Sequence, residues 1–297
     1  MKWLFLLATM VFGATPAAAV NVFACEPEWA ALAQELGGDK VSTVSATTAF
    51  QDPHHIEARP SLIARMRNAD LVVCSGSELE VGWLPLLLTQ SGNGRVQPGS
   101  PGYLEASQYV VKLEVPRVLD RSMGDVHPGG NPHIQTDPRN IAKVAAVLTD
   151  RLAQIDAANA ATYRSRAADF DKRWQEAIRR WEQQAAKLKG VPIVEHHKDF
   201  TYLIHWLGMR EVGTLEPKPG IPPTTAHLAE LVELMKRDPA KLIIYSSYND
   251  PKASQFLSER TGIPAVMIPF TVGGSDKAKD LFGYFDDVIA RLLAPLK

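Results

Sequence analysis

This sequence has no charge bias, no long apolar run after the one at its N-terminus, and only two cysteines. Its 297 residues carry 32 lysines and arginines against 33 aspartates and glutamates, which gives a formal net charge of -1 at pH 7. This balance offers no electrostatic basis for binding nucleic acid or an anionic membrane. With 45% hydrophobic residues, the chain can bury the core of one large domain or of two ordinary ones. It contains no low-complexity tract and no internal repeat.

The N-terminal stretch "MKWLFLLATMVFGATPAAA" predicts a cleavable secretory signal over residues 1–19. It combines one early lysine, an apolar run and a small-residue Ala-x-Ala ending at Ala19. An uncleaved membrane anchor is the alternative, but the run is shorter than the about 20 residues of a spanning helix. No later segment is long enough either. We therefore expect a soluble exported protein that is periplasmic in a cell with two membranes.

The only two cysteines, Cys25 and Cys74, each end a short apolar run, "VNVFAC" and "ADLVVC". Both runs predict buried strands of a parallel sheet, so both sulfurs should lie at the same edge. An oxidising compartment then favours a Cys25–Cys74 disulfide. Two alternatives stay open, namely lipid attachment at Cys25 and a pair of buried free thiols. The bulky Phe23 disfavours lipid attachment, and the export signal disfavours free thiols.

Alternating strand and helix signals predict an α/β fold with two parallel-sheet lobes. Residues 20–155 form the expected N-terminal lobe, in which "YVVKL" is taken as a fourth strand. The chain then predicts helix throughout from Arg139 to Leu188, with Asp137 as the cap and residues 156–189 as one long linking helix. Buried aromatic residues recur along it at helical spacing. Alternation resumes in the expected C-terminal lobe, residues 190–297.

Six of the eight histidines fall into three small groups, each in a predicted loop at the end of a strand or just before a helix. They are His54 and His55, His127 and His133, and His196 and His197. Such junctions gather along one crevice of a parallel sheet, so the groups can meet between the lobes. Neutral imidazole suits zinc, copper or nickel and is a poor ligand for calcium or magnesium. The sequence therefore predicts a metal site in the cleft between the lobes.

The motifs "DPHHIE", "NPHIQTDP", "HHKDFTYL" and "SERTGIPAVMIPF", with the helix between the second and third, carry a family resemblance. In order and spacing they resemble the zinc-type ZnuA/TroA-like (cluster A-I) periplasmic metal-binding proteins of ABC uptake transporters. The resemblance covers essentially the whole chain after the signal. It implies two α/β lobes joined by one rigid helix, with a single metal ion between them. It also implies His54, His133 and His197 as ligands, and histidine at the third place accompanies zinc in this family.

The fourth ligand is where the sequence departs from the family. The family's aspartate two residues after the last strand is replaced by Val272 in "PFTVGGSDKAKD". Water, Asp276, Asp280 and Glu216 are the alternatives. We expect Asp276, because Ser275 can cap the following helix and Asp276 then falls in its first turn. A long histidine-rich loop is also missing, and His127 is the one histidine of the short loop that remains, so a metal-gathering role for this loop is weak.

These features together predict a monomeric, non-enzymatic protein that captures Zn²⁺ and delivers it to the membrane permease subunit of an ABC transporter. A free-standing zinc chaperone would share the same site. A secreted zinc hydrolase would need an open coordination position and a general base, for which Glu57 or Glu195 is nominally available. The sequence contains no HExxH helix, however, which disfavours the hydrolase.

Overall fold

Two parallel sheets of four strands each form the centres of two lobes in the computed structural model, which describes residues 19–118, 120, 124 and 126–296. The first sheet has the order β2-β1-β3-β4, with strands Val41–Ser45, Val20–Ala24, Leu71–Cys74 and Tyr103–Glu105. The second has the equivalent order β6-β5-β7-β8, with strands Arg210–Thr214, Pro192–Glu195, Leu242–Ser246 and Ala265–Ile268. The predicted α/β class with two parallel-sheet lobes is confirmed.

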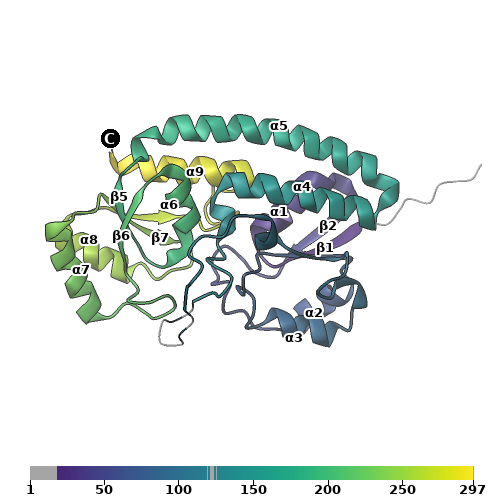
Figure 1. Ribbon diagram of the computed structural model, residues 1–297, viewed down its shortest axis with the longest axis horizontal. Helices are drawn as coiled ribbons and strands as arrows, with labels where there is room; N and C mark the ends of the chain where they lie inside the picture. The colour runs from purple at the N-terminus through teal and green to yellow at the C-terminus, as the bar shows by residue number, and fades with distance from the viewer. Residues whose placement is uncertain (1–18, 119, 121–123, 125, 297) are drawn as a thin grey trace, which may run out of the picture.

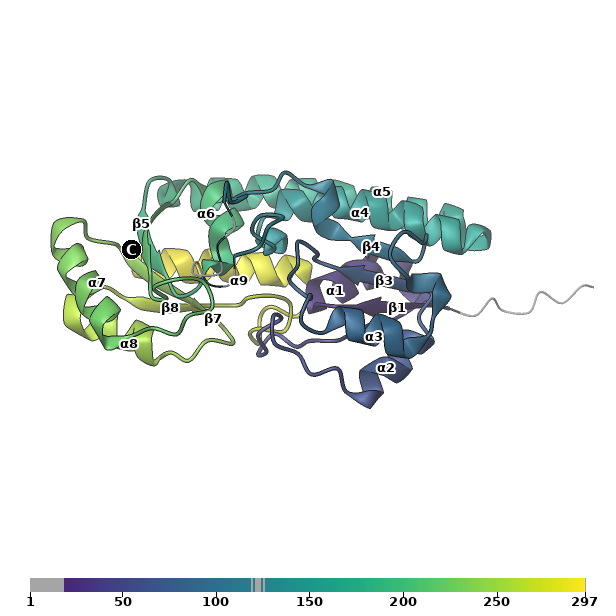
Figure 2. The ribbon, with the colours of Figure 1, turned by 60° about the horizontal axis from the view of Figure 1, so that its bottom comes forward.

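Helices complete both lobes and connect them (Figure 1, Figure 2). The first lobe contains α1, α2 and α3, which span Pro27–Gly37, Pro60–Arg67 and Leu84–Ser91. The second contains α6, α7 and α8, which span Thr201–Leu207, Thr225–Arg237 and Lys252–Thr261. Helices α4, α5 and α9 span Pro138–Ile155, Ala160–Gln184 and Leu281–Leu293. Helix α5 extends along both lobes, with α4 and α9 packed beneath it (Figure 1).

The helical stretch predicted to be continuous from Arg139 to Leu188 is divided at Asp156. Helix α4 ends there because Asp156 leaves the helical region, with φ -125° and ψ 74°. Its carboxylate accepts hydrogen bonds from the Asn159 side chain and the Tyr163 hydroxyl, both at 2.7 Å. Such local side-chain bonds compete with a continuing helix. The long helix is therefore α5, whose 25 residues extend about 38 Å at 1.5 Å per residue.

One face of α5 is aromatic and buried, as its spacing predicts. Trp174 and Trp181 are fully buried, and their rings lie 5.6 and 5.0 Å from that of Phe285 in α9. Their indole N–H groups donate to the Pro138 carbonyl at 2.8 Å and to the Asp286 carboxylate at 2.7 Å. This apolar face, with both polar atoms paired, joins α5 to the rest of the molecule. We call the packed helices α4, α5 and α9 the helical spine.

The predicted Cys25–Cys74 disulfide is present in the first lobe, with the two Cα atoms 4.8 Å apart. It follows from the sheet, because β1 and β3 are parallel neighbours and both cysteines stand at their carboxyl ends. The predicted signal, residues 1–19, lies outside the described residues except for Ala19. Within the described part of the chain, every helix is too short or too polar to cross a membrane.

The structure corrects several local predictions. The segment "YVVKL", Tyr109–Leu113, is not a strand, and its place in the sheet is taken by β4, Tyr103–Glu105. Strand β6 and helix α3 were not predicted at all. Ser275 does not cap the last helix either. Helix α9 begins at Leu281, and Asp280 is its cap, accepting from the Gly283 N–H at 2.8 Å.

Candidate metal centre

Three histidines from separate loops converge between the lobes. His54 follows β2, His133 precedes α4 and His197 follows β5. One ligand nitrogen from each lies within 4.8 Å of the other two. Their ring centroids are 5.4 to 5.7 Å apart, and the ring planes are steeply inclined to one another. Two lie in the sequence before α5 and one after it, so the centre joins both halves of the chain.

His54 is fixed by its own loop. The indole N–H of Trp83 donates to the Pro53 carbonyl at 2.8 Å, which anchors the backbone immediately before the histidine. The Asp52 carboxylate lies 2.7 Å from His54 Nδ1 and also accepts the His54 backbone N–H at 2.9 Å. With Nδ1 bound to Asp52, the imidazole directs Nε2 and its lone pair into the centre.

His197 is oriented in the same way from the second lobe. Its Nδ1 lies 2.7 Å from the Glu216 carboxylate, whose same oxygen accepts the Gly220 backbone N–H at 2.8 Å. This leaves Nε2 free for a ligand. Asp52 and Glu216 therefore each hold the Nδ1 of one candidate ligand histidine. Glu216 was expected only as an alternative ligand, and Asp52 was not predicted, although an aspartate two residues before His54 was the available signal.

His133 is the most buried of the three, with 1% of its surface exposed. Its backbone N–H donates to the Asn131 side chain at 3.0 Å, and its ring meets Phe270 edge-on at 5.4 Å. Neither ring nitrogen has a hydrogen-bond partner among the described residues. A buried imidazole without partners is costly, and a metal ion would satisfy one of its nitrogens. The residues present thus fit a divalent cation with nitrogen ligands.

The electrostatics of the centre also suit a cation. Burial, then the neighbouring His54 and His197, hold the pKa of His133 well below its usual value, so that its imidazole is neutral. For His197, burial lowers the pKa, but the hydrogen bond to Glu216 and the charges of Asp199 and Glu216 outweigh it and raise the pKa to about 9. Neutral imidazole is the form that binds metal, so a metal ion has to displace a proton from His197 near neutral pH.

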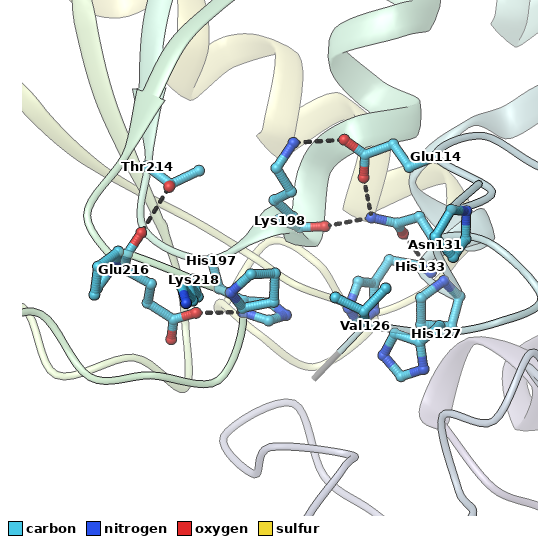
Figure 3. A pocket seen from close by; sticks show the side chains of 14 residues that line it. Glu114, Val126, His127, Asn131, His133, His197, Lys198, Thr214, Glu216 and Lys218 are labelled. Atoms are coloured by element: carbon cyan, nitrogen blue, oxygen red, sulfur yellow. Dashed lines mark hydrogen bonds and ion pairs between the residues drawn. The ribbon is translucent and has the colours of Figure 1, made fainter. Parts of the chain in front are cut away.

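His127 lies closer to the centre than the sequence analysis expected. Its Nε2 is 3.2 Å from His54 Nε2, although it is outside the group of three whose ligand nitrogens lie within 4.8 Å of one another. Burial, then the neighbouring His54 and His197, lower its pKa to about 4. Together with His133 and His197 it lines a pocket of about 460 Å³. Figure 3 shows the rings of His127, His133 and His197 in this pocket, with Glu216 beside His197.

The other residues singled out in the sequence are placed differently. Asp276, the expected fourth ligand, is exposed and lies outside the group of three, because residues 275–279 form turns instead of the first turn of a helix. His55 is exposed. His196 is buried and lines a separate pocket.

Asp199 is a buried carboxylate that the sequence analysis missed. One of its oxygens lies 3.7 Å from His133 Nε2. It accepts hydrogen bonds from the Ser246 hydroxyl and, at 2.7 Å, from the Tyr248 hydroxyl. Burial raises its pKa, and the nearby charge of His197 opposes that rise. It supplies negative charge next to the centre, and its position two residues after His197 was the only signal for it.

Comparison with known proteins identifies the family that this chain matches. The family model described as "ZnuA: Zinc-uptake complex component A periplasmic" matches residues 22–293. The zinc-binding lipoprotein AdcA of Streptococcus pneumoniae is 22% identical over 234 residues, covering 77% of this chain and 46% of the lipoprotein. The high-affinity zinc uptake system protein ZnuA of Bacillus subtilis is also 22% identical, covering 79% of this chain and 73% of that protein. The chain thus spans about half the length of the first of these relatives.

Solved structures share the fold. A crystal structure of ZnuA superposes with a TM-score of 0.75 at 19% identity, covering 92% of this chain and 99% of the other. The Mn-bound periplasmic metal binding protein from Candidatus Liberibacter asiaticus gives 0.76 at 16% identity, covering 94% and 100%. At these identities the similarity concerns the fold alone, and the names of these relatives include more than one metal.

Proposed function

This chain belongs to the family of zinc-uptake complex component A (ZnuA) proteins, and from that premise we propose that it is an extracytoplasmic carrier of Zn²⁺ for an ABC permease. The observation that carries the proposal is the convergence of His54, His133 and His197, whose ligand nitrogens lie within 4.8 Å of one another. Two of these imidazoles are oriented by carboxylates, and the third is buried without a partner. Such a set grips an ion without any chemistry on a bound molecule.

Zinc is the proposed cargo because the donors are imidazole nitrogens. Zinc accepts three or four nitrogen donors in a tetrahedron at about 2.0–2.1 Å, whereas manganese sites are richer in carboxylate and water oxygens. The carboxylates of Asp52 and Glu216 are occupied by histidine Nδ1 atoms. That of Asp199, 3.7 Å from His133 Nε2, accepts two hydroxyl groups. Manganese would have to bind through the same three imidazoles, which favours zinc.

His127 is the proposed fourth ligand, in place of Asp276. Its Nε2 lies 3.2 Å from that of His54. Two ligands of one tetrahedral zinc ion with Zn–N bonds of about 2.0–2.1 Å are separated by about 3.3–3.4 Å, so the two nitrogens already stand at nearly the spacing of a shared ion. Asp276 is exposed and would have to be carried to the centre by a rearrangement of the turns after β8. A fourth imidazole would close the coordination shell, as a carrier requires.

Competitive titration tests the metal. The chain is purified, its bound metal is measured by elemental analysis, and the metal-free protein is titrated with zinc and manganese against each other. We expect one tightly held zinc ion per chain and weak manganese binding. Replacing His133 or His197 with alanine should weaken zinc binding by more than the about 10–100-fold that loss of an outer partner costs. Preferential binding of manganese at equilibrium would contradict the proposal.

Delivery to a permease requires a separate test, since a free-standing chaperone would use the same centre. Vesicles that contain the candidate permease and its ATPase are supplied with zinc-loaded protein, and zinc accumulation and ATP hydrolysis are measured. A carrier stimulates both only when it is loaded. Transfer of zinc to a soluble acceptor, without any effect on the vesicles, would identify a chaperone instead.

A further inference from the structure

Three buried carboxyl groups lie in the first lobe, outside the histidine centre, and one of them, that of Glu80, lies beside the disulfide. Glu26, Glu28 and Glu80 are 1 to 3% exposed. None of them forms an ion pair with a cationic side chain anywhere in the described ranges, and the Oε1 atoms of Glu26 and Glu28 have no hydrogen-bond partner there. Buried acids without a counter-charge are costly. This cluster is therefore suited to a cation other than the one proposed for the histidine centre.

The disulfide and Glu80 lie within the span of a single metal site. One ligand atom from each of Cys25, Cys74 and Glu80 lies within 4.8 Å of the others. The backbone N–H of Ser75 donates to Glu80 at 2.8 Å and fixes this carboxyl. Two thiolates of a tetrahedral zinc site, with Zn–S bonds of about 2.3 Å, are about 3.8 Å apart, whereas bonded sulfurs are about 2.0 Å apart, so the reduced sulfurs have to separate by about 1.8 Å to hold zinc.

Glu26 adjoins the same site. Its Oε2 accepts the Ser75 hydroxyl at 3.0 Å and, at 3.2 Å, the same Ser75 backbone N–H that Glu80 binds. Its Oε1 has no hydrogen-bond partner among the described residues, although Glu26 is outside the group of three whose ligand atoms lie within 4.8 Å of one another. Two thiolates with carboxylate oxygens are donors that zinc accepts.

We propose that Cys25, Cys74 and Glu80 form a second zinc site when the two cysteines are reduced. The first lobe is then held together at this point either by the disulfide or by Zn²⁺. The exchange balances when a dithiol is the reductant. The dithiol gives two electrons and two protons and becomes a cyclic disulfide, the protein S–S bond becomes two thiolates, and zinc binds both. Two protons are released for each zinc ion bound. The cleft histidines take no part.

Burial determines how the second site is filled. Both cysteines have no exposed surface, and Glu80 is 3% exposed. Zinc therefore enters while the chain folds with reduced cysteines, and it leaves slowly once the lobe has closed. This separates it from zinc in the cleft, where His54 is only partly buried. A chain folded in a reducing compartment should carry one more zinc ion than the oxidised chain.

Cobalt refolding tests the proposal without interference from the cleft. The full chain carrying His54→Ala, His133→Ala and His197→Ala is unfolded, then refolded with Co²⁺ either reduced or with the disulfide formed beforehand. A chelator is added after refolding. We expect one chelator-resistant cobalt ion per reduced chain, with the near-ultraviolet charge-transfer absorption that thiolate ligands give, and none in the oxidised chain. Histidine and carboxylate ligands do not produce this absorption.

Matched variants assign the ligands. Cys25→Ser should abolish the absorption, and Glu80→Gln should weaken cobalt binding at least about tenfold. Glu57→Gln, at an exposed position, should change neither. A reduced chain that reaches the native circular dichroism spectrum without retaining cobalt would overturn the proposal. So would a reduced chain that stays unfolded with and without cobalt. Loss of zinc binding in the cleft has no bearing on this result.

Discussion

The helical spine and the histidine centre are both buried, yet they satisfy their polar atoms differently. In α5 of the spine, the indole N–H groups of Trp174 and Trp181 both have partners, and the other buried residues are aromatic or apolar. In the centre, both ring nitrogens of His133 lack hydrogen-bond partners among the described residues. The buried face of α5 is therefore complete without any ligand, whereas a cation would satisfy one of these nitrogens. Stability and metal affinity should accordingly respond to different substitutions.

Substitution in the spine is the strongest test of this separation. Trp181→Ala removes a fully buried ring that packs on Phe285. It should lower the free energy of unfolding by about 3–5 kcal/mol. Zinc affinity of the folded fraction should stay unchanged, because Trp181 contacts no ligand histidine. Urea unfolding and zinc titration of the same variant measure both effects, and a matching loss of affinity would show that the two regions are coupled.

Glu28 is an exception to this comparison, because it is a buried carboxyl group in α1, a helix of the first lobe that packs against the helical spine. It lies in α1 and accepts the Thr271 hydroxyl from the far end of the chain. Burial raises its pKa from 4.5 to about 7. Between about pH 4.5 and about pH 7 the folded state therefore keeps a proton that the unfolded state releases. Glu28 lowers the free energy of unfolding progressively across this range and has no effect on it at lower pH.

Glu28→Gln should remove that pH dependence while keeping an acceptor for Thr271. The raised pKa corresponds to a stability loss of about 3 kcal/mol at high pH. Urea unfolding near about pH 5 and about pH 8 should therefore show a smaller decline for the variant than for the parent. Equal declines would mean that Glu28 is not the group responsible.

The outer partners of the centre come next in expected size. Asp52→Asn and Glu216→Gln keep the shape of the side chains that fix His54 and His197 but remove their charge. Each should weaken zinc binding by about 10–100-fold. The free energy of unfolding of the metal-free protein should change little in comparison with Trp181→Ala. Zinc titration with a competing chelator measures the first effect, and unchanged affinity in both variants would remove the proposed orienting role.

The smallest effect distinguishes two candidates for the fourth ligand. His127→Ala should weaken zinc binding about tenfold or more, since His127 Nε2 lies 3.2 Å from His54 Nε2. Asp276→Ala should leave the affinity unchanged, because Asp276 is exposed. The reverse result would support the carboxylate expected from the sequence.

The sequence predicted those features that depend on local patterns. Strands β1, β3, β5 and β7 are apolar runs bounded by polar residues, and the aromatic spacing of α5 is visible without a structure. Strand β4 has only three residues, Tyr103–Glu105, which is too short to show alternation. The exposed valines that follow it, such as Val111, gave the misleading strand signal instead.

The histidine groups could be found from their loops, and Asp52, two residues before His54, was a signal available in the same loop. The role of His127 arises only when distant loops meet, because its contact to His54 spans 73 residues of sequence. The cap of the last helix was misjudged for a related reason. Ser275 and Asp280 can both cap a helix, and the structure selects Asp280.

The disulfide has a consequence for the covalent connectivity of the chain. Cys25 and Cys74 are 49 residues apart, and His54 lies inside the ring that they close, whereas His133 and His197 lie outside it. One proteolytic cut between residues 26 and 73 therefore opens the ring without separating His54 from the other two ligands. The nicked chain remains a single molecule until a reductant is added, at which point it divides into two fragments.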